Sequence, residues 1–538
     1  MTFRELLEMR SEKEGGKPFL FFRNKIVDFA TLDQKANKAA NFFRDLGVKR
    51  RDHVCMFLPN YPEFLYLWFG LIKIGAVMVP LNTHLRKESL AYIINNCDAK
   101  CIVVNEALYY AYAYVEKDLK KIKQKIWHSE CAPEPETFLP LNTFMDSADE
   151  KAPPIIDIKD EEPLAILYTS GTTGPPKGVM ISQFNYINTG MIWAKDIIGY
   201  REDDIVFSTL PLFHENAQMF STMSCLVSGR PYVLREGFSP SSFFDEVRQY
   251  GATVLHLVGF MVAMLMKQPE RENDSDNPAR VAISTYTPRE IWHNFEKRFN
   301  LTILEGYGVT ECGGVCLSNT THDIKIGSIG KPTRFCDVTI WDENNREVPA
   351  GQAGEIVVKE KIPCSMFLGY YKHLDKTTEA WEGGWFHTGD MGYMDQDGCF
   401  YFVDWMKNCI RRHEEIISPL EIEKVVNSHP KVLDSAAVPI PLDTGEDDIK
   451  IYVTLKPNEL LEPEELIAFC KERIPYFMVP KYVEYIKELP ETSTQGIQSV
   501  ELRKGKSAMF RIGGNVKYKP KGCNGTREPT HGKKTEHI

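Results

Sequence analysis

The 538-residue sequence lacks an uninterrupted apolar run of membrane-spanning length. Its most apolar region, Phe64 to Leu81, carries Lys73 in its middle and Pro80 near its end. Because a charge at the centre of a bilayer is costly, we expect a buried helix followed by a strand here, and no membrane span. The first residues, MTFRELLEMRSEKEGG, also lack the apolar core of a secretory signal. These absences favour a cytoplasmic protein.

A surplus of positive charge is absent as well. The chain has 64 Lys and Arg against 74 Asp and Glu, a net charge of −10. Binding to nucleic-acid phosphates needs a clustered excess of Lys and Arg, so we expect no nucleic-acid partner. The 13 cysteines include no CxxC pair, and Cys97 with Cys101, like Cys312 with Cys316, have a spacing that fits neither a redox pair nor a zinc knuckle. We expect reduced, mostly buried thiols.

The chain does have the length and composition of a globular protein with more than one core. At 43% hydrophobic and 26% charged residues, two or more folded domains are expected. Up to about residue 305, helical segments such as Thr31 to Leu46 alternate with β-branched runs such as Cys101 to Val104. This alternation predicts βα units around largely parallel sheets. One such helix is expected to have Ser239 as its N-cap and to end at Gly251.

After residue 330 the pattern changes to short strands, at Val338 to Asp342, Gly354 to Val358 and Cys399 to Asp404, between turns rich in Gly, Asn and Asp. Mixed α/β segments return beyond residue 407, and from Lys504 a Lys-, Gly-, Asn- and Thr-rich composition predicts a largely disordered tail. We therefore expect an α/β fold. It has a large N-terminal domain of parallel sheets flanked by helices (1–406) with a small β-rich subdomain (330–406), a smaller α+β C-terminal domain (407–503) and a tail (504–538).

The most informative stretch is YTSGTTGPPKG, Tyr168 to Gly178, which directly follows the apolar run Leu164 to Leu167. Its glycines let successive backbone N–H groups curl toward an anion, its hydroxyls add neutral donors, and Lys177 supplies a charge for outer phosphates. The commoner phosphate loop is excluded, because there Ser or Thr follows the lysine. A mobile surface loop is the ordinary alternative for such a composition. The particular string favours the binding of a nucleoside triphosphate.

Three segments downstream carry further chemistry. GYGVTE, Gly306 to Glu311, follows an apolar run and should lie at the end of a strand. GWFHTGD, Gly384 to Asp390, ends in a carboxylate that can only accept hydrogen bonds when ionised. LPLFHENAQ, Leu210 to Gln218, contains a histidine. Each has an ordinary alternative taken alone: a turn with a helix cap, an Asp in a Gly-Asp turn, and a satisfied core histidine.

Together the four segments resemble, in sequence and in order, the motifs of the adenylate-forming superfamily, over roughly residues 5–503. This superfamily contains acyl-CoA synthetases, peptide-synthetase adenylation domains and luciferases. The resemblance implies that a small carboxylic acid attacks the α-phosphorus of ATP, and that the thiol of coenzyme A then displaces AMP. It implies ATP, Mg²⁺ and coenzyme A as cofactors, a mobile C-terminal domain that turns at a hinge at Lys407, and a homodimer among the candidate assemblies.

The resemblance also assigns roles to residues. The implied catalytic residues are Lys177 and Thr310 at the phosphates, Glu311 as the Mg²⁺ ligand, and His214 beside the substrate carboxylate. Tyr307 would stack on the purine, and Asp390 would accept hydrogen bonds from the ribose hydroxyls. The full set of implied cofactor-binding residues is Thr169, Ser170, Gly171, Thr172, Thr173, Gly174, Tyr307, Asp390 and Lys407.

Four positions depart from the family pattern. Trp405 stands where the family has an arginine, His413 and Glu414 replace two glycines, and STYTP at Ser284 to Pro288 replaces a glycine-rich adenine segment. In LPETSTQGIQ, Gly496 occupies the place of the lysine that bridges the acyl carboxylate and the α-phosphate. Loss of such a contact typically lowers the rate by roughly 10² to 10³.

Two hypotheses follow for the function. The first is an AMP-forming acyl-CoA ligase, most similar to the crotonobetaine/carnitine and fatty-acid types, with adenylation slowed by Gly496. The second is a catalytically impaired pseudoenzyme that binds nucleotides or acyl-CoA; carrier-protein loading is a further alternative, which the lack of a carrier serine motif disfavours. Glu215, where fatty-acid enzymes usually carry an apolar residue, favours an acyl substrate with a cationic part.

Overall fold

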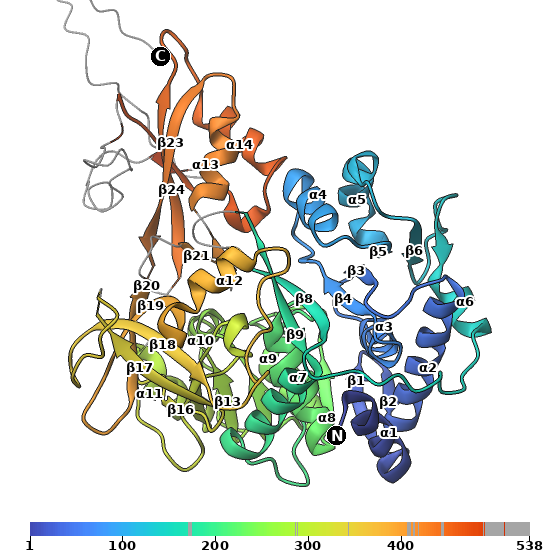
Figure 1. The fold of residues 1–538 in the computed structure, drawn as a ribbon. Helices are drawn as coiled ribbons and strands as arrows, with labels where there is room; N and C mark the ends of the chain where they lie inside the picture. The colour runs from blue at the N-terminus through green and yellow to red at the C-terminus, as the bar shows by residue number, and fades with distance from the viewer. Residues whose placement is uncertain are drawn as a thin grey trace, which may run out of the picture.

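The computed structural model describes residues 1–169, 175–285, 287, 289–342, 344–405, 410–412, 415–417, 419–442, 446–487, 489 and 510–511. Figure 1 shows two α/β regions side by side, coloured blue and green, with the yellow β-rich strands beside the green region and the orange C-terminal segment above. The predicted α/β fold is confirmed.

The N-terminal sheet is parallel except for its last strand pair. Its strand order is β7-β6-β5-β3-β4-β8-β9, and β8 and β9 form an antiparallel hairpin. The strands are β3 (His53–Phe57), β4 (Val77–Pro80), β5 (Cys101–Asn105), β6 (Gln124–His128), β7 (Leu139–Pro140), β8 (Pro163–Thr169) and β9 (Lys177–Ser182). The helices of this region are α2 (Phe29–Asp45), α3 (Pro62–Lys73), α4 (Lys87–Asn96), η1 (Glu106–Leu108), α5 (Tyr109–Val115), η2 (Glu116–Asp118) and α6 (Leu141–Ser147).

The apolar region Phe64 to Leu81 forms most of α3 and all of β4, as predicted. Helix α3 is buried because it packs closely on α2: a Cβ at Gly70 would lie only 2.6 Å from Cβ of Ala39. Lys73, also buried, donates to Asp33 and Asn37. Among the helices that the structure describes, none combines the length and the apolar character that a membrane crossing requires.

A second sheet has the strand order β16-β15-β14-β13-β12-β10-β11-β1-β2. Its central strands are parallel and its edges antiparallel. The strands are β1 (Pro18–Phe22), β2 (Lys25–Asp28), β10 (Val206–Ser208), β11 (Tyr232–Leu234), β12 (Val254–His256), β13 (Val281–Ser284), β14 (Thr302–Tyr307), β15 (Leu317–Ser318) and β16 (Lys331–Pro332). Its helices are α1 (Phe3–Glu14), α7 (Gln183–Met191), η3 (Ile192–Ile197), η4 (Asn216–Met223), α8 (Ser224–Ser228), α9 (Phe243–Tyr250), α10 (Gly259–Met266) and α11 (Arg289–Phe299).

The start of α9 differs from the sequence prediction. The helix begins at Phe243 rather than just after Ser239, with Ser242 as its N-cap residue. The preceding turn is held by other partners, since the Ser241 carbonyl accepts from Arg271 and Ser242 donates to Glu246. The predicted end at Gly251 is confirmed, with a left-handed φ of +64°.

The β-rich segment is an antiparallel sheet of β17 (Cys336–Trp341), β18 (Gly354–Glu360), β19 (Phe386–Met394) and β20 (Phe400–Trp405), in that order. It includes α12 (Leu374–Ala380) and η6 (Glu382–Gly384). All three strands predicted after residue 330 are present within a few residues of the predicted bounds.

The C-terminal segment has its own core, formed by buried side chains between residues 410 and 483. Its elements are β21 (Ile410–Arg412), β22 (Glu415–Ile417), α13 (Pro419–Asn427), β23 (Val432–Pro441), β24 (Asp447–Leu455), α14 (Pro463–Lys471), η7 (Tyr476–Met478), β25 (Tyr482–Tyr485) and β26 (Phe510–Arg511). The sheet order is β23-β24-β25-β26. The boundary at residue 407 stays a prediction, and the tail from residue 504, apart from β26, lies outside the described residues.

The predicted state of the cysteines is confirmed for the described part of the chain. These cysteines are free thiols, and all but Cys131 and Cys364 are buried.

Candidate active site

The predicted phosphate loop joins the two strands of the β8–β9 hairpin. Thr169 at the end of β8 pairs with Lys177 at the start of β9, so the two flanks of the loop are held side by side. Gly178 allows this close pairing, because a Cβ there would lie 2.6 Å from Cγ2 of Ile166. The loop residues themselves, Ser170, Gly171, Thr172, Thr173 and Gly174, lie outside the described residues.

Lys177 and Glu311 are brought to the same place by a third residue, Tyr370. The Lys177 ammonium lies 4.2 Å from the centroid of the Tyr370 ring, and the Tyr370 hydroxyl donates to Oε1 of Glu311 over 2.7 Å. Glu311 belongs to η5 (Thr310–Cys312), which follows β14. The motif GYGVTE therefore lies at the end of a strand, as predicted, and Tyr370 brings its Glu311 near the lysine.

The environment of Glu311 suits a carboxylate that receives a cation. Burial raises the pKa of Glu311, against the opposing effects of the Tyr370 hydrogen bond and the Lys177 charge. A buried carboxylate of this kind gains from a nearby dication. Among the described residues no group of three or more His, Cys, Asp or Glu side chains could hold a metal alone. A single buried carboxylate such as Glu311 has the donor chemistry that Mg²⁺ would need, and its role as the metal ligand stays a prediction.

Tyr307 and Asp390 also meet across the fold. The Tyr307 hydroxyl at the end of β14 donates to Oδ2 of Asp390 in β19 over 2.6 Å. Both side chains are buried, with 1% and 4% of their surface exposed. The contact connects the second large sheet to the β-rich sheet at the nucleotide motifs. Purine stacking by Tyr307 and ribose binding by Asp390 stay predictions.

His214 contacts the C-terminal segment. Its Nε2 lies 3.0 Å from Oε1 of Glu415 in β22, and the Asn82 amide donates to the same oxygen over 2.7 Å. Burial alone would raise the pKa of Glu415, but His214 and Asn82 outweigh it and the pKa lies below its usual range. The histidine predicted to lie beside the acyl carboxylate is thus paired with a residue that no sequence motif had singled out.

A small cavity of about 150 Å³ is lined by residues from three of the predicted segments. Thr169, His214 and Thr310 all line it, together with Glu215 and Glu415. Three of the four predicted segments therefore meet at one cavity, while the roles of their residues stay predictions.

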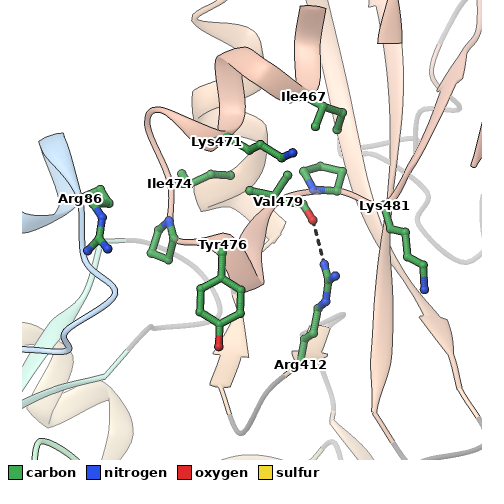
Figure 2. Close-up of a pocket in the computed structure, with 10 residues that line it drawn as sticks. Arg86, Arg412, Ile467, Lys471, Ile474, Tyr476, Val479 and Lys481 are labelled. Carbon is green, nitrogen blue, oxygen red and sulfur yellow. Dashed lines mark hydrogen bonds between the residues drawn. The ribbon is translucent and has the colours of Figure 1, made fainter. Parts of the chain in front are cut away.

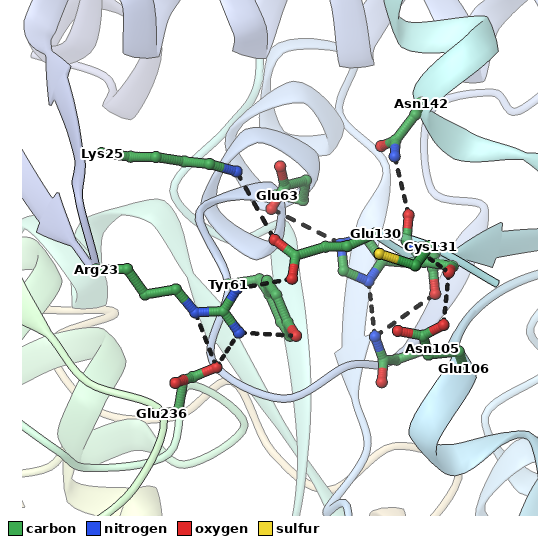
Figure 3. Close-up of polar contacts among 12 residues, drawn as sticks. Arg23, Lys25, Tyr61, Glu63, Asn105, Glu106, Glu130, Cys131, Asn142 and Glu236 are labelled. Carbon is green, nitrogen blue, oxygen red and sulfur yellow. Dashed lines mark hydrogen bonds and ion pairs between the residues drawn. The ribbon is translucent and has the colours of Figure 1, made fainter.

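A larger cavity of about 400 Å³ adjoins it and shares His214 and Glu415. Glu236 is in its wall and is held by Arg23, whose Nε donates to it over 3.1 Å (Figure 3). Arg23 also donates to Glu130 over 2.7 Å, so an N-terminal hairpin fixes this wall.

Comparison with known proteins identifies the family. The family model described as AMP-binding enzyme matches residues 7–371, and the model of its C-terminal domain matches residues 421–495. The chain belongs to the AMP-binding enzyme family.

Several proteins of this family are similar over nearly the whole chain. A crotonobetaine/carnitine–CoA ligase of Proteus mirabilis is 36% identical over 480 residues, 86% of this chain and 90% of that protein. One of Citrobacter koseri is 33% identical over 515 residues, 93% and 99% of the two chains.

Among solved structures, an o-succinylbenzoate CoA synthetase of Bacillus subtilis has a TM-score of 0.82 at 22% identity, covering 94% of this chain and 99% of its own. A benzoate CoA ligase of Burkholderia xenovorans has a TM-score of 0.70 at 24% identity, covering 94% and 100%. These two likenesses establish the fold.

As an AMP-binding enzyme, the chain is an ATP-dependent, AMP-forming acid–CoA ligase that acts on a carboxylic acid and coenzyme A. The acyl-CoA ligase of the first hypothesis is confirmed, and nothing in the comparisons points to a pseudoenzyme; the effect of Gly496 on adenylation stays a prediction.

The positions where this AMP-binding enzyme departs from its family mostly lie outside the described part of the chain. This holds for the side chain of Trp405 and for His413, Glu414 and Gly496, and the predicted hinge residue Lys407 also lies outside the described residues. In the STYTP segment, the Thr287 amide donates to the Glu305 carboxylate over 3.1 Å, which ties this segment to β14.

Sequence reasoning missed Tyr370 and Glu415. Tyr370 lies in FLGYYK, where the aromatic pair after a glycine gives no hint of its pairing with β9. Glu415 directly follows His413 and Glu414, which depart from the family pattern. Its place beside these two residues is the only feature of the sequence that points to it.

Proposed function

We propose that this AMP-binding enzyme activates a carboxylic acid that carries a cationic group, of the carnitine type, with Mg²⁺ bound at Glu311. The observation that carries the substrate class is Glu215, which lines the small cavity beside His214 and Thr310. In the described part of the chain its carboxylate has neither a hydrogen-bond nor an ion-pair partner. An unpaired carboxylate next to the reacting groups favours a substrate that brings its own positive charge.

The neighbours of Glu215 support this substrate class. A Cβ at Gly314 would lie 3.8 Å from Cγ of Glu215, 3.1 Å from Sδ of Met219 and 3.2 Å from Cε1 of Phe220, so the three side chains converge there. A carboxylate, a polarisable thioether and an aromatic ring together provide the surroundings in which proteins bind quaternary ammonium groups. The two curated relatives named above are crotonobetaine/carnitine–CoA ligases, which is the same chemistry.

The proposed reaction has two steps, and the residues of the site described above act in the first. In the first step the substrate carboxylate, beside His214, attacks the α-phosphorus and pyrophosphate leaves, while Lys177 and the Thr310 hydroxyl stabilise the charge on the phosphates. When bound at Glu311, Mg²⁺ supplies further neutralisation of phosphate charge. In the second step the coenzyme A thiol attacks the acyl carbon and AMP leaves.

A basic cavity of about 490 Å³ suits the phosphates of coenzyme A (Figure 2). Arg86, just before α4, lines it from the N-terminal region, and Arg412, Lys471 and Lys481 line it from the C-terminal segment. Within the described residues, neither Arg86 nor Lys471 has a carboxylate partner. Burial accordingly lowers the pKa of Arg86. Cations that lack an anion in the protein favour a polyanionic ligand.

The substrate proposal is tested by Glu215→Gln. We measure kcat/KM for carnitine and for a neutral carboxylic acid of equal length, and expect the ratio to fall roughly 10-fold as the carboxylate is lost. Glu236→Gln is the matched control, because this carboxylate lines the adjoining cavity but is already paired with Arg23. If Glu215→Gln left the ratio unchanged, the cationic substrate class would be wrong.

We also propose a cytoplasmic location. Free thiols at all described cysteines suit a reducing compartment. We also expect a homodimer, and a measurement of the protein's mass in solution tests this expectation.

A further inference from the structure

Tyr370 touches both charged groups that serve the triphosphate. Its hydroxyl donates to Glu311 over 2.7 Å, and its ring lies 4.2 Å below the Lys177 ammonium. We infer that Tyr370 is a positioning residue, which holds Lys177 and Glu311 in place while keeping their charges from neutralising each other. This inference rests on the roles proposed above for these two residues.

The chemistry of a tyrosine suits both contacts at once. The face of the ring carries negative charge density and attracts the ammonium, while the phenol hydroxyl is a donor that the carboxylate accepts. A cation over a ring is held less strongly than a cation in a buried ion pair with a carboxylate. The ring contact therefore orients Lys177 without occupying the Glu311 carboxylate, which accepts from the Tyr370 hydroxyl instead.

The backbone fixes Tyr370 between the two elements that it serves. Val179 in β9 and Tyr370 form an antiparallel bridge, and Met180 donates its backbone N–H to the Gly369 carbonyl over 3.0 Å. On the other side, Phe367 donates its backbone N–H to the Glu311 carbonyl over 2.9 Å. The short segment 367–370 thus connects the strand that begins with Lys177 to the turn that contains Glu311.

The side chain has little freedom to leave this position. Only 5% of its surface is exposed, and its ring packs edge-on against Phe367 with centroids 5.1 Å apart. Its backbone N–H donates to the Thr377 hydroxyl over 2.9 Å. A locked side chain that contacts two functional groups is what preorganisation of a binding site requires.

The test separates the hydroxyl from the ring. Tyr370→Phe removes only the hydrogen bond to Glu311, and Tyr370→Leu also removes the ring below Lys177. The matched control is Tyr371→Phe, since the hydroxyl of this neighbouring tyrosine also donates to a carboxylate, Asp98, over 2.9 Å. We measure ATP binding by calorimetry without acid or coenzyme A, over a series of Mg²⁺ concentrations, and pyrophosphate release separately.

For Tyr370→Phe we expect the Mg²⁺ concentration for half-maximal ATP binding to rise roughly 10-fold, with little change in ATP affinity at saturating Mg²⁺. For Tyr370→Leu we expect ATP affinity to fall roughly 10-fold even at saturating Mg²⁺, because Lys177 is no longer oriented. Tyr371→Phe should match the unmodified protein in both measurements. If the two Phe variants behave alike, the inference is overturned.

A double variant shows whether Tyr370 acts through Glu311. In a Glu311→Gln background, Tyr370→Phe should change the Mg²⁺ requirement by less than about twofold, since the partner charge is already gone. A full additional effect would contradict the inference. Melting temperatures control for folding, and Tyr370→Met, which keeps bulk without a ring face, replaces Tyr370→Leu if the latter does not fold. Because no acid is present, failure of the substrate proposal would leave these results unaffected.

Discussion

The two carboxylates predicted to bind metal and ribose, Glu311 and Asp390, are each buried against a tyrosine hydroxyl. Tyr370 donates to Glu311 and Tyr307 donates to Asp390. The sequence predicts both carboxylates and Tyr307 through its resemblance to the family motifs, which are short segments of neighbouring residues. They do not predict Tyr370, because its contact with Glu311 joins residues 59 positions apart and depends on how β9 packs.

Asp390→Asn tests the ribose role of this carboxylate. The amide has one acceptor oxygen where the carboxylate has two. That oxygen must also accept the hydrogen bond from the Tyr307 hydroxyl. We expect KM for ATP to rise roughly 10-fold to 100-fold in pyrophosphate release assays, with a smaller effect on KM for the acid. Asp337→Asn, on the exposed face of β17, is the control and should leave both values unchanged. Equal effects on ATP and acid would contradict the assignment.

Gly496→Lys tests the most consequential departure from the family pattern. Residue 496 lies outside the described residues, so this prediction rests on the sequence alone. A lysine at this position should speed adenylation by roughly 10² in single-turnover experiments, because it supplies charge at the reacting centre. An unchanged rate would mean that another group already supplies that charge.

At the scale of elements, helix α13 carries a half-buried carboxyl toward the active-site cavities. Glu421 lines a cavity of about 70 Å³ together with His214 and Glu415. Burial raises the pKa of Glu421 to about 7; the charge of Glu415 adds to this, and Lys424 opposes it. Because this folded-state value lies above the usual value of 4.5, the contribution of Glu421 to stability is full below pH 4.5 and is lost as the pH rises through about 7.

Glu421→Gln should therefore stabilise the protein mainly at high pH. We expect its melting temperature, relative to the unmodified protein, to rise by a few degrees at pH 8 and by less than half as much at pH 5.5, which lies closer to the usual value of 4.5. Glu464→Gln, an exposed residue in the first turn of α14, is the control and should show no such difference. A gain of equal size at both pH values would rule out titration of Glu421 as the cause.

Most elements could be predicted because their signals are local. The β-branched runs in parallel strands and the Gly251 helix end needed only nearby residues, and both are confirmed. The start of α9 could not be predicted, because the turn before it is held by Arg271, about 30 residues away. Long-range hydrogen bonds of this kind override a good N-cap in the sequence.

At the scale of the whole molecule, the C-terminal segment is joined to the N-terminal region around residues 82–87. Glu415 accepts from Asn82, the His84 ring lies 4.9 Å from that of Tyr476, and Lys87 lies 3.8 Å from Glu472. Such contacts span hundreds of residues, so the sequence could not place the segment over His214. In this arrangement it lines the three cavities described above that contain His214.

The most direct test of the account is to identify the products formed from ATP, Mg²⁺ and coenzyme A with carnitine or with a neutral acid of equal length. Chromatography with mass detection measures AMP and the acyl-CoA thioester together. We predict equal amounts of AMP and carnitinyl-CoA, with far less product from the neutral acid. Preference for the neutral acid would contradict the cationic substrate class, and acid-dependent formation of ADP in place of AMP would contradict the mechanism itself.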